Sequence, residues 1–168
     1  MTNGTLELRP VQPSDRDFLL TLYGEIRGAE MAMVPWTEAQ KNAFVLQQFD
    51  AQHAWWTTQY PTARFDLVLL DGCPVGRLYV DEWEQEIRVI DVALVARARG
   101  RGLGSRLLRA VFRQADEAGK PVSIHVEQFN PARRLYERLG FNYRDGGAGV
   151  YLKMVREPEP AGRQGVIP

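Results

Sequence analysis

The stretch LVARARGRGLGSRLLRAVF, residues Leu94–Phe112, decides the fold prediction, because it holds a strand end, a glycine-rich turn and a helix start in immediate succession. Residues 87–95, which lead into it, are almost continuously apolar, as is typical of a central strand covered on both faces. Beyond the turn, apolar residues recur at helical spacing and arginines occupy the other side. The stretch therefore predicts a buried strand, a turn and an amphipathic helix.

The turn Arg99–Ser105 carries glycines at three alternate positions, Gly100, Gly102 and Gly104. Glycine lets the backbone approach a ligand closely, and the first turn of a helix offers unpaired N–H groups at its positive dipole end. This combination favours a phosphate cradle. The spacing fits neither the Walker A sequence nor the dinucleotide fingerprint. An ordinary tight turn between strand and helix is the alternative.

Length and composition predict an ordinary soluble globular protein of a single domain, with the cytoplasm as the default location. The 168 residues have a formal net charge of zero, so no global field favours nucleic acid or a membrane. A lone cysteine, Cys73, excludes an internal disulfide and fits a reducing compartment. The sequence shows neither an apolar run of membrane-spanning length nor a signal-peptide pattern at its start. We expect one domain over residues 1–156 and a flexible tail over residues 157–168.

Periodicity and turn signals predict strands and helices along the whole chain. We expect helices at about residues 15–27, from the capping box at Thr37 to Pro61, at 103–118 and at 130–140. Strands are expected at residues 5–11, 65–70, 75–80, 87–95, 122–126, 141–144 and 149–155. The strand at 122–126 would pair in parallel with the one that ends at Val95, through the long helix between them.

Two motifs together resemble one family. Arg99, Gly102 and Gly104 match the pyrophosphate loop Arg/Gln-x-x-Gly-x-Gly/Ala of the GNAT family of acetyl-CoA-dependent N-acetyltransferases. Further on, residues 130–141 (NPARRLYERLGF) resemble the distal signature of the same family, in which an asparagine precedes a tyrosine and then Gly-Phe. The motifs occur in the expected order, and the resemblance extends over about residues 5–155.

The resemblance implies an α/β GNAT fold with a mixed, mostly antiparallel central sheet of about seven strands and four helices, in the order β-α-α-β-β-β-α-β-α-β-β. It also implies acetyl-CoA as co-substrate and direct transfer of the acetyl group to a primary amine of a small molecule or peptide, without a metal or a covalent intermediate. The alternatives are a non-catalytic acyl-CoA-binding sensor on the same scaffold and an RNA-associated module that uses the arginine face. A homodimer is left open.

By the same resemblance, the cofactor is held by the strand end, the glycine turn and the distal motif. Backbone N–H groups near the strand end would meet the acetyl oxygen and the pantetheine arm, and the turn would bind the pyrophosphate. Asn130 would both cap its helix and touch the pantetheine. The expected cofactor-binding residues are Leu94, Ala96, Arg99, Gly100, Arg101, Gly102, Leu103, Gly104, Ser105, Asn130 and Arg133.

The resemblance makes Tyr136 the general acid that protonates the departing thiolate. The general base is harder to assign, because Arg88 occupies the position at which many members of the family have a glutamate. Asp91 is the nearest substitute, since a carboxylate inside an apolar strand is costly unless it is paired or functional. Pairing with Arg77 is the structural alternative for Asp91. Glu127, the acidic hairpin or a chain of waters are further candidates for the base, while the histidines His125 and His53 are expected in packing or solvent.

The acceptor pocket would be bordered by residues 27–36 and by the acidic hairpin at residues 82–86. Acidic side chains in both segments could attract a cationic amine, and Trp36 or Trp83 could provide a flat wall. A solvated acidic rim is the alternative interpretation. The acids concerned are Glu30, Glu82, Glu84 and Glu86.

Overall fold

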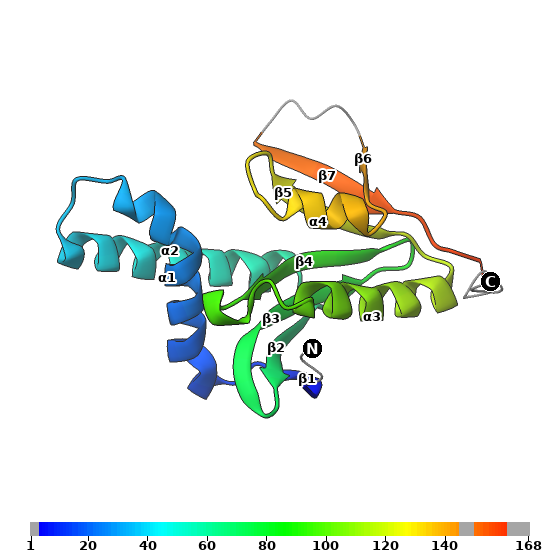
Figure 1. Cartoon of the computed structure of the whole chain (residues 1–168), viewed down its shortest axis with the longest axis horizontal. Coiled ribbons are helices and arrows are strands. Elements are labelled where there is room, and N and C mark those ends of the chain that lie inside the picture. The colour runs from blue at the N-terminus through cyan, green and yellow to red at the C-terminus, as the bar shows by residue number, and fades with distance from the viewer. Residues whose placement is uncertain (1–3, 145–149, 161–168) are drawn as a thin grey trace. The chain divides into compact units, whose positions relative to one another are not determined.

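The computed structural model describes residues 4–144 and 150–160. Within those residues the chain forms seven strands and four α-helices (Figure 1). Two short 3-10 turns, Pro13–Asp15 and Ala96–Ala98, precede α1 and follow β4. The elements run in the order β1 (Leu6–Pro10), α1 (Arg16–Ala32), α2 (Glu38–Gln59), β2 (Arg64–Leu70), β3 (Cys73–Glu82), β4 (Ile87–Leu94), α3 (Leu103–Ala118), β5 (Val122–Glu127), α4 (Arg133–Arg138), β6 (Asn142–Arg144) and β7 (Tyr151–Arg156).

The strands are hydrogen-bonded in the order β1-β2-β3-β4-β5-β7-β6. β1 pairs antiparallel with β2, and β7 pairs antiparallel with both β5 and β6. β4 and β5 are parallel, as expected for two strands joined through a helix. This confirms the predicted α/β class, the order of the elements and the mixed, mostly antiparallel sheet.

Internal contacts divide the chain into two compact units, one of Met1–Leu78 with Val92–Arg101, the other of Tyr79–Asp91 with Gly102–Pro168. In the first unit, α1 and α2 pack on each other, and a buried cluster joins them to β2. The ring of Tyr23 lies 5.9 Å from that of Phe49 within this cluster. The remaining members of the cluster are Leu19 and Leu67.

The second unit is built on β5, β7 and β6, with α3 in contact with β5 (Figure 1). α3 is strongly amphipathic, and its apolar side is fully buried. The ring of Phe141 links two helices, because it lies 5.5 Å from Phe112 of α3 and 5.8 Å from Tyr136 of α4. Packing of α4 against this aromatic group fixes the helix that carries the distal motif.

Three element boundaries differ from the prediction. α1 continues to Ala32 rather than ending near residue 27, because Ala29, Glu30 and Met31 favour helix and Glu30 pairs with Arg27 one turn earlier. β3 begins at Cys73, so the hairpin turn is only Asp71–Gly72 and Cys73 lies exposed at the strand start.

α4 begins at Arg133, two residues after Pro131, where the first helical position was expected. The preceding turn bonds Arg133 N–H to the Asn130 carbonyl and Arg134 N–H to the Pro131 carbonyl, an i to i+3 pattern that is not α-helical. The predicted turn at residues 145–147 and the start of the last strand at residue 149 lie outside the described residues. Among the described helices, none is both long and apolar enough to cross a membrane.

Candidate active site

In the first unit, the end of β4 lies very close to β3. A Cβ atom placed on Gly76 would lie 2.2 Å from the Ala93 carbonyl oxygen, so only glycine fits this position of β3. Beside it, the Val95 N–H donates to the Val75 carbonyl at 2.8 Å. A glycine inside a strand is the sequence signal for such a close approach.

The segment after β4 is braced by hydrogen bonds from within the first unit. The Ala96 N–H donates to the Glu25 carboxylate at 2.8 Å, and the Arg99 Nε–H donates to the Leu94 carbonyl at 3.0 Å. Two groups predicted to serve the cofactor therefore have protein partners in this structure. The contribution of Glu25 was not predicted, since nothing in the sequence marks a helix residue 71 positions earlier as a partner of this turn.

The glycines of the turn have two different structural roles. Gly100 and Gly102 have φ of 72° and 77°, which other residues rarely adopt. Gly104 is helical, and a Cβ atom there would lie 3.5 Å from Leu135 Cδ2, an ordinary contact. The protein's own packing does not require glycine at position 104, so a larger side chain is excluded there only if a ligand comes close.

The start of α3 has the geometry of an anion site. Gly102 caps the helix in a left-handed conformation, and its carbonyl accepts the Arg106 N–H at 3.1 Å. No side chain caps this end, which leaves the N–H groups of the first turn without intrahelical acceptors. Those N–H groups and the helix dipole suit an anion at Leu103–Ser105.

The distal motif lies in the turn before α4 and in the helix itself. The Asn130 side chain accepts the Ala132 N–H at 2.9 Å, so it stabilises the turn as a cap does. The guanidinium of Arg133 bonds the Gln128 carbonyl and donates to the Tyr143 hydroxyl at 2.8 Å. Arg133 therefore orders the segment around α4 through its own hydrogen bonds.

Tyr136 is only 4% exposed, and its hydroxyl has no hydrogen-bond partner among residues 4–144 and 150–160. Burial, with a smaller contribution from the negative charge of Asp91, raises the pKa of the phenol well above its usual range. The phenol therefore stays protonated at any physiological pH. The same effect shows that the two predicted catalytic side chains of the second unit lie within electrostatic reach of each other.

Parallel pairing of β4 with β5 extends only over Ile87–Val89 and Val122–Ile124. Asp91 of β4 and Glu127 of β5 both follow the paired region and are half-buried. The hydroxyl of Tyr151 donates to Glu127 at 3.5 Å.

Arg88 is buried in a polar cluster that the sequence did not predict. Its Nε–H donates to the Ser123 hydroxyl at 2.8 Å, its other nitrogen lies 3.8 Å from Glu86, and its guanidinium stacks 5.0 Å from the Trp83 ring. The Ser123 hydroxyl bonds Glu86 in turn. This position of β4 thus holds a structural ion pair.

The histidines occupy different environments. On β5, partial burial and then the charges of Arg88 and Lys153 lower the pKa of His125, while Glu86 opposes the shift. His125 is consequently neutral at pH 7. His53 is exposed on α2.

Most of the predicted acidic rim is already neutralised by nearby cations. Glu82 accepts from Gln114 at 2.8 Å and from Lys120 at 3.3 Å, Glu86 belongs to the Arg88 cluster, and Glu30 pairs with Arg27 at 2.9 Å. Only Glu84, among these four acids, has no partner in the described part of the chain. Part of the expected loop at residues 27–36 is also helical, because α1 reaches Ala32.

Comparison with known proteins gives one consistent result. Residues 30–141 match the family model of the acetyltransferase (GNAT) family. A D-amino-acid N-acetyltransferase, HPA3, of Saccharomyces cerevisiae is 23% identical over 145 residues, which cover 84% of this chain and 88% of that protein.

Solved structures share the fold. The PaiA N-acetyltransferase of Thermoplasma acidophilum, solved with coenzyme A, is 14% identical with a TM-score of 0.68, over 91% of this chain and 99% of that one. An acetyltransferase of Thermus thermophilus is 23% identical with a TM-score of 0.67, over 91% and 97%. The family match covers about two thirds of the chain and includes both motifs. The chain belongs to the GNAT acetyltransferase family, as an acyltransferase that uses acetyl-CoA as its co-substrate.

Proposed function

We propose that this acetyltransferase moves the acetyl group of acetyl-CoA directly to a primary amine, with Asp91 as general base and Tyr136 as the group that faces the departing thiolate. The observation that carries the proposal is the buried phenol of Tyr136, whose pKa is raised by burial and, to a smaller extent, by the negative charge of Asp91. Enzymes place a general base and a hydrogen-bond donor in one site when the nucleophile must lose a proton and the leaving group gains negative charge.

Asp91 would take the proton that the attacking amine must lose. An amine is nucleophilic only when neutral, whereas an alkylammonium of the lysine type has a pKa near 10.4. Asp91 is half-buried and follows the part of β4 that pairs with β5. Its carboxylate would stabilise the ammonium form of the substrate and then accept the proton that the ammonium loses. Asp91 lies on the same strand as Arg88, three residues further along.

Tyr136 would act chiefly as a hydrogen-bond donor. A phenol near pKa 10 is a weaker acid than a thiol near 8.5, so full proton transfer to the thiolate is uphill by about 2 kcal/mol, and burial of Tyr136 widens this gap. A hydrogen bond from a hydroxyl without another described partner stabilises the developing thiolate instead.

The cofactor-binding assignments form part of the same proposal. The N–H groups of Leu103, Gly104 and Ser105 would hold the pyrophosphate, with charge from Arg101. The backbone of Leu94 and Ala96 would serve the acetyl end, and Asn130 would order the turn beside the pantetheine arm. Arg99 would support the turn through its bond to the Leu94 carbonyl. Gly100 would allow the turn to adopt its left-handed backbone conformation. Arg133 would stabilise the segment around α4 through its hydrogen bond to Tyr143.

An amine screen tests the proposal. The purified protein is mixed with acetyl-CoA and a panel of D- and L-amino acids, polyamines, aminoglycosides and arylamines, and release of free thiol is followed together with acetylated product. We expect turnover with at least one amine. Thiol release at the same slow rate with and without every amine would contradict the proposal.

The base is tested with Asp91→Asn and the matched control Glu127→Gln. We expect the first change to lower kcat about a hundredfold at neutral pH while acetyl-CoA affinity is retained, and the second to leave kcat almost unchanged. Loss of activity in Glu127→Gln with full activity in Asp91→Asn would assign the base to Glu127. Melting curves of both variants exclude unfolding as the cause.

A further inference from the structure

A pocket of about 380 Å³ lies in the second unit, away from the residues of the proposed reaction. It is bordered by the C-terminal half of α3, the end of α4, the end of β7 and the residues just after it. Four arginines and two carboxylates line it. The pocket is therefore unusually rich in charge for a surface whose overall balance in this protein is neutral.

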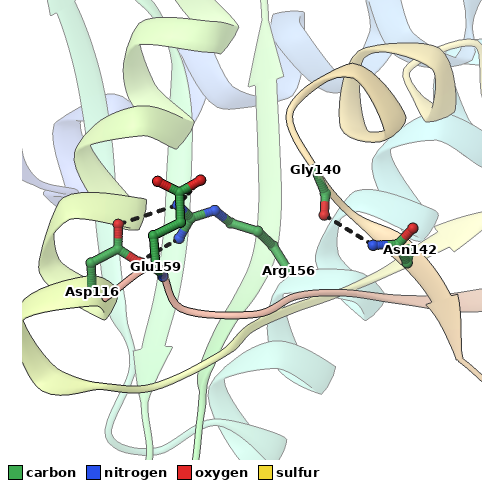
Figure 2. A network of polar contacts seen from close by, with 5 residues as sticks. All are labelled: Asp116, Gly140, Asn142, Arg156 and Glu159. Atoms are coloured by element: carbon green, nitrogen blue, oxygen red, sulfur yellow. Dashed lines mark hydrogen bonds and ion pairs between the residues drawn. The ribbon is translucent and has the colours of Figure 1, made fainter. Parts of the chain in front are cut away.

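Both carboxylates are bound to a single buried arginine (Figure 2). Arg156 is 7% exposed, and its guanidinium lies 4.3 Å from the centre of the Phe112 ring. Asp116 receives hydrogen bonds of 2.7 and 3.2 Å from it, and the Glu159 carboxylate lies 3.7 Å from it. Arg156 and the two acids thus form a preformed wall with a formal net charge of −1.

The remaining guanidiniums, those of Arg109, Arg113 and Arg138, are exposed and have no partner in the part of the chain that the structure describes. Arg109 and Arg113 are one turn apart on α3, where like charges repel each other. Arg138 approaches the same pocket from α4. With the four arginines and two carboxylates counted together, the pocket carries a formal charge of +2, which an anion would balance.

We propose that this pocket binds a small molecule through a phosphate group. A phosphate offers three acceptor oxygens to three guanidinium forks, whereas a single carboxylate offers two. The volume suits a compact ligand at the lower end of small-molecule sites. The one aromatic ring of the pocket is covered by Arg156, so recognition rests on the phosphate and offers no ring for a base to stack on.

The pocket is separate from the predicted pyrophosphate cradle. That cradle lies at the first residues of α3, and Arg113 follows Leu103 by ten residues. At 1.5 Å per residue Arg113 is roughly 15 Å along the helix from Leu103, whereas Arg109 lies one turn beyond Ser105, so the separation of the two sites rests on Arg113 and on Arg138 of α4. A ligand here would leave the cradle accessible to acetyl-CoA.

Inorganic pyrophosphate is the probe, titrated calorimetrically into the full chain that is already saturated with acetyl-CoA. Wild type is compared with the double variant Arg109→Ala/Arg113→Ala and with Arg134→Ala, an exposed α4 arginine that does not line the pocket. Acetate serves as the matched weak anion. Melting temperatures and acetyl-CoA affinity are measured for each variant, so a folding defect is separated from a binding defect.

We expect pyrophosphate to bind the acetyl-CoA complex, acetate not to bind, the double variant to bind at least about tenfold more weakly, and Arg134→Ala to behave as wild type. Competition between pyrophosphate and acetyl-CoA would assign the binding to the cradle and overturn the proposal. So would binding that survives the double substitution, or no binding by the folded wild type. None of these results bears on amine acetylation.

Discussion

At the scale of single residues, Tyr136 combines burial with a hydroxyl that has no partner among the described residues. The hydroxyl is not among the fully buried side-chain atoms left without a partner, so its removal should change stability little. Tyr136→Phe keeps the ring packing on Phe141 and removes only the hydroxyl. We predict a kcat lower by about one hundredfold, an unchanged acetyl-CoA affinity and a melting temperature close to that of wild type. Steady-state kinetics and thermal unfolding of the variant measure all three.

A variant with full activity would assign Tyr136 to packing alone. A variant that is inactive and also unstable would show that the hydroxyl has a structural partner. The two outcomes are separable because activity and stability are measured on the same preparation.

At the residue level, the sequence offers candidates where position marks a residue type, and it misses contacts whose partner is remote. Asp91 stands out as a charge in an apolar strand, and Tyr136 follows the motif at Asn130. By contrast, no local pattern could reveal that Glu25 receives the Ala96 N–H, or that Arg88 stacks on Trp83. These contacts depend on how distant elements are brought together, which periodicity does not specify.

At the scale of elements, α3 is tied to β7 by the ion pair of Asp116 with Arg156, both side chains about one-tenth exposed. Hydrogen bonds from Arg156 lower the pKa of Asp116, against the opposing effect of burial, and the Glu159 N–H adds to the shift. We predict that Asp116→Asn lowers the free energy of unfolding by about 3 kcal/mol at pH 7, since it leaves a buried cation with a weakened partner. Chemical denaturation of both proteins gives the difference.

The pH dependence of that difference follows from the lowered pKa. The ion pair contributes fully above the unfolded pKa of Asp, about 3.9, and its contribution is lost as the pH falls through the lower folded value. Wild type and Asp116→Asn should therefore differ most above about pH 5, and the difference should shrink steadily as the pH falls below about 4. A difference that stays constant down to low pH would contradict the assignment.

The elements themselves were predictable in type and order, but less so at their ends. Apolar spacing identified α3, whose N-cap and C-cap glycines match its true limits. The end of α1 was placed too early because Gly28 suggested a break, whereas the good helix formers after it carry the helix to Ala32. Glycine within a helix costs only about 1 kcal/mol, which neighbouring residues can offset.

At the scale of the whole molecule, the position of the domain end can be tested. The expected domain ends at residue 156, yet the Glu159 N–H donates to Asp116 at 2.9 Å, and Glu157 pairs with Arg144 at 2.7 Å. We predict that a chain that ends at Arg156 is less stable, by about 1 kcal/mol, than a chain that ends at Pro160. Thermal and urea unfolding of the two truncated proteins are compared directly. Equal stability of the two proteins would support residue 156 as the end of the folded domain.

The global fold was predictable from the chain because two motifs, the strand order and one parallel pairing agree with each other. The division into two compact units was not, since β3 and β4 each run through both. The hairpin that these strands form is a single continuous pattern in sequence. A boundary that crosses it leaves no mark in composition or in turn residues.

The account depends most directly on acetyl-CoA bound at the start of α3, and one substitution isolates that claim. Gly104→Glu places a carboxylate in the first turn of α3, where its Cβ makes only an ordinary contact with Leu135. An acid at a helix N-terminus is favourable, so the variant should fold as stably as wild type. Gly28→Glu in α1 is the charge-matched control, because a Cβ there meets nothing within 4 Å.

The measurement is calorimetric titration of acetyl-CoA into wild type and both variants. The account predicts that wild type and Gly28→Glu bind alike and that Gly104→Glu, while fully folded, binds at least about tenfold more weakly, because the carboxylate occupies the N–H groups meant for the pyrophosphate and repels its charge. Equal affinity in all three proteins would contradict the cradle at the start of α3.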